Sequence, residues 1–273
     1  MFYGMKKLIY LMVSLVLVSC SDQLMVDEMA GERAMLAPAS EFGALIEKAR
    51  WGDGQAYLML ADCYRDGRGV QKDFLAMMCM TMQAEVYGGI SRSDDYLKEM
   101  AADEEFRLIF DAVNLYERNE MEAFVAKMEQ LISMDSPYGS FLKGLYVLEK
   151  NDSIEGKELV VKAAAQGSAL AELMLCVPDW RDTNTPDAEK LKMVAGRIPM
   201  AYRLLGDYYS GMDNINTRDD ELAVLYYKKA DELAYLGRRA AKWLLDYYER
   251  TGAPVNSMEM KRLRKLSQYM TNQ

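Results

Sequence analysis

Two long segments of this chain present small, aromatic and glycine residues in the same order, and this repetition constrains the fold more than any other feature. The segments run from Ala56 to Gly89 and from Ala201 to Gly237. Corresponding positions pair Ala61 with Gly206, Tyr64 with Tyr209, Gly67 with Gly211, Ala76 with Ala223, and Ala84 with Ala230. A unit that recurs along a chain predicts an array in which stacked neighbours bury one continuous core.

The first copy predicts a helix, a tight turn and a second helix. Apolar and small residues from Tyr57 to Tyr64 follow the spacing of one helix face. Gly67 is typical of a helix end and Asp73 of a helix start, and the second helix is expected to end at Gly88 and the glycine after it. The loop "YRDGRGVQKDF" would suit a phosphate only if a strand preceded it, so the sequence favours a turn.

Other segments continue the pattern. Residues 136–167 repeat the order with Gly139, Gly144, Tyr146, Ala163, Ala164 and Gly167. Residues 168–176 and 238–252 each begin a further first helix, and residues 104–135 keep the rhythm of two helices with fewer small side chains. We expect the small residues to let helices approach closely, while tyrosine and leucine fill the wider gaps between layers.

These residues resemble the Sel-one-like repeat family, which is a group of short relatives of tetratricopeptide repeats. The first copy matches the family pattern at Ala56, Leu60, Tyr64, Gly67, Gly69, Val70, Asp73, Ala76, Ala84 and Gly88. The resemblance covers residues 41–273, is strongest at 52–89, 137–170 and 200–252, and weakens in the middle and at 176–199. It implies an all-α fold, a right-handed α-solenoid of stacked antiparallel helix pairs, with about five to six units, some of them degenerate.

The N-terminus predicts a signal peptide over residues 1–20. Lys6 and Lys7 precede an uninterrupted apolar run from Leu8 to Val18. This run is shorter than the ~20 residues that a membrane-spanning helix needs. Residues 21–40 mix charge with Gly, Ala and Pro without a sustained period, so we expect a flexible tether there.

The junction "LVSC", which ends at Cys20, resembles the lipobox of bacterial lipoproteins. The resemblance implies cleavage before Cys20 and acylation of its thiol, so that the membrane is a partner through an N-terminal lipid anchor. Ser21 stands where an aspartate would imply retention at the inner membrane. The family rule therefore implies the outer membrane, with the protein facing the periplasm or the surface. An ordinary secretory signal with an incidental cysteine is the alternative.

Composition excludes several classes of function. The chain has 33 basic and 42 acidic residues, a net charge of −9 and no cluster of lysine and arginine, so nucleic acid is not an expected partner. It has no histidine, which excludes Ser-His-Asp and Cys-His catalysis and histidine-ligated zinc. Few enzyme mechanisms remain without histidine. The Sel-one-like resemblance implies a protein that binds partners and is not an enzyme, and we expect no cofactor.

The remaining cysteines and the methionines favour a packed core. Cys63 and Cys79 fall on helices that should be antiparallel neighbours, so a disulfide between them is conceivable. Helical cysteines, Cys176 included, are more often small buried hydrophobes. The 22 methionines are interpreted as core filler, and a methionine-lined binding groove is a second interpretation.

Few residues stand out as candidates for chemistry. Acidic clusters at 94–95, 103–105 and 219–221 lie in expected loops or at helix starts, where carboxylates complement the helix dipole. Residues 182–187 and 213–221 hint at calcium loops but fail the required spacing. Trp51 and Trp243 are expected on apolar helix faces in the core. Trp180, beside Arg181 in an irregular stretch, is the candidate anchor for binding a protein.

These features together predict a lipoprotein of the bacterial cell envelope that acts as a scaffold or adaptor between proteins. We expect a protein or peptide ligand on the concave face of the solenoid, which the first helix of each pair would line. One alternative is a hydrolase or binding protein for cell-wall peptide or glycan, which a cleft with two facing carboxylates would favour. A regulator of envelope signalling is the other alternative.

Overall fold

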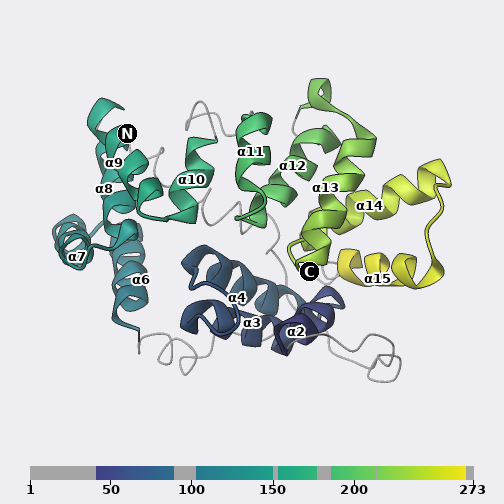
Figure 1. The fold of residues 1–273 in the computed structure, drawn as a ribbon, viewed down its shortest axis with the longest axis horizontal. Helices are drawn as coiled ribbons and strands as arrows, with labels where there is room; N and C mark the ends of the chain where they lie inside the picture. Colours follow the sequence, from purple (N-terminus) through teal and green to yellow (C-terminus); the bar gives the residue numbers. More distant parts are fainter. Residues whose placement is uncertain (1–40, 89–102, 150–152, 177–185, 213, 269–273) are drawn as a thin grey trace. The chain divides into compact units, whose positions relative to one another are not determined.

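The structure is a computed structural model, and it describes residues 41–88, 103–149, 153–176, 186–212 and 214–268. Within these ranges every regular element is a helix and none is a strand, which confirms the predicted all-α class there (Figure 1). The helices are α2 (Glu41–Arg50), α3 (Gly54–Asp66), α4 (Phe74–Gly88), α6 (Glu104–Glu117), α7 (Met121–Ser133), α8 (Pro137–Glu149), α9 (Ser153–Ala165), α10 (Ala169–Leu175), α11 (Ala188–Val194), α12 (Met200–Ser210), η1 (Ile215–Thr217), α13 (Asp220–Glu232), α14 (Gly237–Thr251) and α15 (Ser257–Gln268).

The helices belong to two compact units. One unit contains α6 to α10, and the other contains α2 to α4 together with α12 to α15. The division falls within α11, after Lys190. In both units consecutive helices pack against each other, as in the pairs α3 with α4, α6 with α7, α8 with α9, α12 with α13, and α14 with α15.

The α3–α4 pair forms as the sequence predicts. α3 begins at the N-cap Asp53 and ends at Gly67, whose φ of 71° suits glycine because a left-handed residue there closes the helix. Asp73 then caps α4, since its Oδ1 accepts a hydrogen bond of 3.1 Å from the Ala76 amide. The Asp73 amide donates to the Tyr64 carbonyl at 3.0 Å, which ties the start of α4 to the end of α3.

The α12–α13 pair repeats this turn. α12 ends at Gly211, whose φ is 70°. The Asp219 amide donates to the Tyr209 carbonyl at 2.8 Å, and the Asp219 carboxylate caps α13 by accepting from the Leu222 amide at 3.0 Å. The two copies therefore share the left-handed glycine, the tyrosine carbonyl and the aspartate cap, although their loops differ in length.

Small residues permit close helix contacts, as predicted. A β-carbon at Gly206 of α12 would overlap the ring of Tyr227 on α13. In the α8–α9 pair, a β-carbon at Gly144 would lie 3.0 Å from the Gly156 carbonyl oxygen. The alanines at two further small positions of the pattern, Ala61 and Ala230, are fully buried. These contacts lie inside single units.

Other predictions from the sequence are confirmed in part. Asp103 caps α6 by accepting from the Phe106 amide at 3.1 Å, and Asp219 caps α13, so both clusters are helix starts. Met77 and Met80 fill the core, whereas Met193 is 80% exposed. The methionines therefore do not all serve as core filler.

The interpretation of Trp51 and Trp243 as core residues is wrong in detail. α2 ends at Arg50, so Trp51 lies in a turn and not on a helix face, and it is partly exposed. Its carbonyl accepts a 3.0 Å hydrogen bond from the Lys265 ammonium. Trp243 lies on a helix, α14, as expected, but it is also partly exposed. Its indole packs against the buried Tyr227 and stacks on Tyr247.

Candidate binding surface

Three tyrosine rings form a stack across α12 and α13. Tyr202 and Tyr209 lie seven residues apart on α12, which places them two turns apart on one face. Tyr226 of α13 stacks on both, with ring centroids 6.5 Å from Tyr202 and 5.7 Å from Tyr209 and interplanar angles of 22° and 12°. All three rings are partly exposed, so the stack reaches the surface of its unit.

Two lysines accompany this stack. The Lys229 ammonium lies 5.4 Å from the ring centroid of Tyr202 and 5.7 Å from that of Tyr226. The Lys192 ammonium lies 5.6 Å from the centroid of Tyr209. These distances fall in the range of cation–π attraction. We refer to Tyr202, Tyr209, Tyr226, Lys192 and Lys229 as the tyrosine–lysine surface.

The same sequence positions have different surroundings in the first copy. Tyr57 corresponds to Tyr202, but it is 2% exposed and stacks on the buried ring of Tyr87. Tyr64 corresponds to Tyr209, but the Phe42 ring of α2 packs edge-on against it at 5.7 Å. Burial raises the pKa of Tyr64 to about 12. The partial exposure of Tyr202 is thus a property of the α12–α13 pair and not of the repeat pattern.

A second aromatic row lies on α13 and α14. Trp243 stacks on Tyr247 with centroids 5.5 Å apart and packs against Tyr227 at the same distance. Tyr227 is fully buried and donates a 2.8 Å hydrogen bond to Asp207. Burial and the Asp207 charge raise the pKa of Tyr227, so its hydroxyl keeps its proton and serves as a fixed donor.

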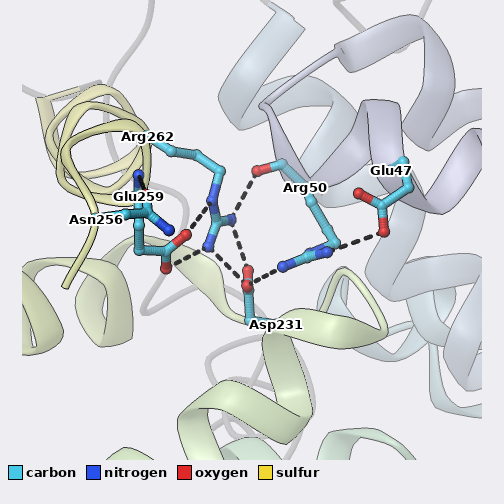
Figure 2. A network of polar contacts seen from close by, with 6 residues as sticks. All are labelled: Glu47, Arg50, Asp231, Asn256, Glu259 and Arg262. Atoms are coloured by element: carbon cyan, nitrogen blue, oxygen red, sulfur yellow. Dashed lines mark hydrogen bonds and ion pairs between the residues drawn. The ribbon is translucent and has the colours of Figure 1, made fainter. Parts of the chain in front are cut away.

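A buried ion-pair network joins α2, α13 and α15 (Figure 2). Figure 2 shows Asp231 between the guanidinium groups of Arg262 and Arg50. Arg262 donates to both carboxylate oxygens of Asp231, at 2.7 and 2.6 Å, and Arg50 donates to one of them at 2.9 Å. Asp231 is 5% exposed and Arg262 is 3% exposed, so water screens this contact poorly.

Every N–H of Arg262 has an acceptor. Besides Asp231, its guanidinium donates to Glu259 at 3.1 and 2.8 Å and to the Arg50 carbonyl at 3.0 Å. Burial lowers the pKa of Arg262, but the attraction of Asp231 and the hydrogen bonds outweigh it, so the pKa is raised. Glu47 completes the network by accepting from Arg50 at 2.9 Å. The arrangement balances the buried charges, and among the described residues only the Arg50 Nε of this network is left without an acceptor, so we interpret its role as holding helices together.

None of the described cysteines forms a disulfide, and all three are buried, namely Cys63, Cys79 and Cys176. The structure therefore has no disulfide between Cys63 and Cys79. Burial raises the pKa of Cys63, and raises that of Cys176 to about 11, so these thiols stay protonated near neutral pH.

The site candidates from the sequence fall elsewhere in the chain. Cys20, Trp180 and Arg181 lie outside the described residues, as do the expected signal peptide and tether. Sequence reasoning did not single out the tyrosine–lysine surface, because it assigned the tyrosines to gaps between layers. The available signal was the spacing of Tyr202, Tyr209 and Tyr226 together with the lysine three residues after Tyr226.

The described residues contain no group of three or more cysteine, aspartate or glutamate side chains placed to hold a metal ion. None of the helices in the described ranges has both the length and the apolar character needed to cross a membrane.

The chain was compared with models of protein families, with curated proteins and with solved structures, and no match was found in any of the three.

Proposed function

We propose that this chain is a helical-repeat protein of the bacterial cell envelope that binds another protein or a peptide. The observation that carries the proposal is the recurrence of one helix-turn-helix design. The α3–α4 and α12–α13 pairs share the left-handed glycine, the amide to tyrosine carbonyl bond and the aspartate cap. Arrays of such units bind partners along extended surfaces, which is how the Sel-one-like resemblance supports a scaffold or adaptor.

In this proposal the pairs continue as a right-handed α-solenoid of about five to six units over residues 41–273. The close contacts at Gly144 and Gly206 support it, because each lets two helices of a pair approach as the family pattern requires. Binding is favoured over catalysis because a partly exposed tyrosine stack is typical of interfaces, where tyrosine is enriched.

Cross-linking from defined positions tests the binding role. A photoreactive phenylalanine at Tyr202 should capture a discrete partner in intact cells, since Tyr202 is partly exposed within the stack. The matched position is Met258 of α15, which is 53% exposed and outside the stack. An adduct specific to Tyr202 supports a protein ligand. Capture of wall glycan or wall peptide instead, or equal capture at both positions, would reject it.

We also propose that the chain is held at the outer membrane through a lipid on Cys20. The support is the lysine pair, the apolar run and the lipobox-like "LVSC". Replacing Cys20 by serine should move the protein from the membrane pellet to the soluble fraction in a preparation without detergent. Retention of the Cys20→Ser variant in the pellet would contradict the anchor while leaving the binding role intact.

A further inference from the structure

The tyrosine–lysine surface offers a distinctive chemistry to a ligand. Tyr226 stacks with both Tyr202 and Tyr209, and the Lys229 ammonium also lies over its ring, so the faces of this ring already have neighbours. The stack therefore presents ring edges and hydroxyl groups to a ligand. The edge of an aromatic ring carries partial positive charge, and the face carries partial negative charge. A ligand that approaches the edges of this stack therefore meets positive potential from the rings themselves.

The lysine adds to that potential. Lys229 forms no ion pair with any described residue, and its ammonium lies 5.4 Å from the ring centroid of Tyr202 and 5.7 Å from that of Tyr226. Its side chain is partly exposed, which leaves the ammonium able to meet a further anion. The hydroxyls of Tyr202 and Tyr209 make no hydrogen bond within the described ranges, so each can donate to an acceptor of a ligand. These groups all favour a carboxylate or another anion.

Charge also bears on the ligand of this surface. The chain as a whole is acidic, with a net charge of −9, whereas Lys192 and Lys229 place two cations beside the tyrosine stack. A sugar ring would bind through the flat faces of aromatic rings, and those of Tyr226 are taken. An anionic membrane is disfavoured, because membrane recognition uses clusters of about four to eight cations, and this surface has two.

The dimensions suit a short extended segment. Tyr202 and Tyr209 are separated by seven residues of helix, which is a rise of roughly 10 Å. Three residues of extended chain span roughly the same length. From these observations we propose that the tyrosine–lysine surface binds an extended acidic segment of a partner protein, whose carboxylates meet Lys229, Lys192 and the tyrosine hydroxyls. This inference rests on the proposed binding function and names the chemistry of its partner.

Fluorescence anisotropy of labelled peptides with the purified full chain tests this inference. The probes are a decapeptide of alternating glutamate and leucine, its alternating lysine and leucine counterpart, and vesicles that contain phosphatidylglycerol. We expect the acidic peptide to bind, the basic peptide not to bind, and the affinity for the acidic peptide to fall as salt rises to about 0.15 M. The Lys229→Glu substitution should weaken binding by about tenfold or more, because it places like charges together.

The control is Lys242→Glu, which makes the same charge change at an exposed position of α14. If this variant weakens binding as much as Lys229→Glu does, general charge and not the surface is responsible, and the inference fails. Equal binding of acidic and basic peptides, or binding of the vesicles alone, would also overturn it. A partner cross-linked at Tyr202 without any binding of the acidic peptide would reject the acidic segment and leave the binding function standing.

Discussion

Asp231 balances the charge of two arginines that belong to different helices. We expect Asp231→Ala to lower the free energy of unfolding by about 3–5 kcal/mol, because it leaves the buried guanidinium of Arg262 without its main partner. Asp231→Asn should cost less, since the amide keeps one acceptor. Urea unfolding followed by circular dichroism measures both.

The control for Asp231 is an exposed pair. Glu249 accepts from Arg264 at 3.0 Å, and the two side chains are 49% and 53% exposed. We expect Glu249→Gln to change the free energy of unfolding by less than about 1 kcal/mol. If Asp231→Ala were as mild as Glu249→Gln, the network would contribute nothing beyond a surface pair.

Gly206 leaves room for the ring of Tyr227, which packs directly against it. We expect Gly206→Ala to lower the free energy of unfolding by about 1–3 kcal/mol, because the new methyl group would overlap Tyr227. Tyr227 cannot move aside easily, since it is fully buried and held by Asp207. Thermal unfolding provides the measurement. Gly196→Ala is the control and should be close to neutral, because nothing lies within 4 Å of the added atom.

Local features of single residues could be predicted from the sequence, and long-range partners could not. Gly67 and Asp73 were identifiable because a helix end and a helix start depend on nearby residues. Arg50 and Asp231 are 181 positions apart, and no local pattern indicates that they meet. The partial exposure of Tyr202 could not be predicted from the repeat either, since Tyr57 occupies the corresponding position in the first copy and is buried.

The start of α4 depends on a cap that is also partly desolvated. Asp73 accepts from the Ala76 amide, so we expect Asp73→Ala to cost about 1 kcal/mol of stability. Asp219→Ala should cost a similar amount at the start of α13, where the cap bond is 3.0 Å. Equilibrium unfolding in urea measures both variants, and a neutral Asp73→Ala would show that the turn holds α4 without its cap.

The same cap predicts a dependence on pH. Burial raises the pKa of Asp73 above its ordinary 3.8, and hydrogen bonds from the Ala76 and Leu75 amides oppose this only in part. The contribution of this raised pKa to stability is therefore present below pH 3.8 and is lost as pH rises through the folded-state value. Asp73→Asn keeps the acceptor and removes the charge. We expect the variant to gain stability relative to the wild type as pH rises from 3.5 to 7. A constant difference across urea titrations in this range would contradict the assignment.

The helices themselves were largely predictable because each carries its own start, end and apolar face. α6 and α7 followed the expected rhythm of two helices although their small residues are few. α2 contacts α13, and α12 contacts α14, and these contacts between non-consecutive helices had no counterpart in the repeat pattern. Periodicity specifies which face of a helix is buried, but it does not specify which distant helix covers that face.

The unit that contains α2 to α4 and α12 to α15 is assembled from both ends of the described chain. α15 supplies Arg262 to the network, donates from Lys265 to the Trp51 carbonyl, and buries Leu263 and Leu266. A segment near the C-terminus therefore secures the first described helix. This closure makes the stability of α2 depend on residues more than 200 positions away.

Removing α15 tests that dependence. In a chain that ends at Gly252, Arg50 keeps Asp231 but loses the Arg262 contact to its carbonyl, and Trp51 loses its bond from Lys265. Local opening of α2 then costs less free energy, because these contacts no longer have to be broken. We therefore expect amide hydrogen exchange in α2 to become at least roughly tenfold faster. The control chain lacks only residues 269–273 and should exchange like the full chain. Unchanged exchange in α2 after removal of α15 would show that α3 alone holds α2 in place, and that the buried network does not secure it.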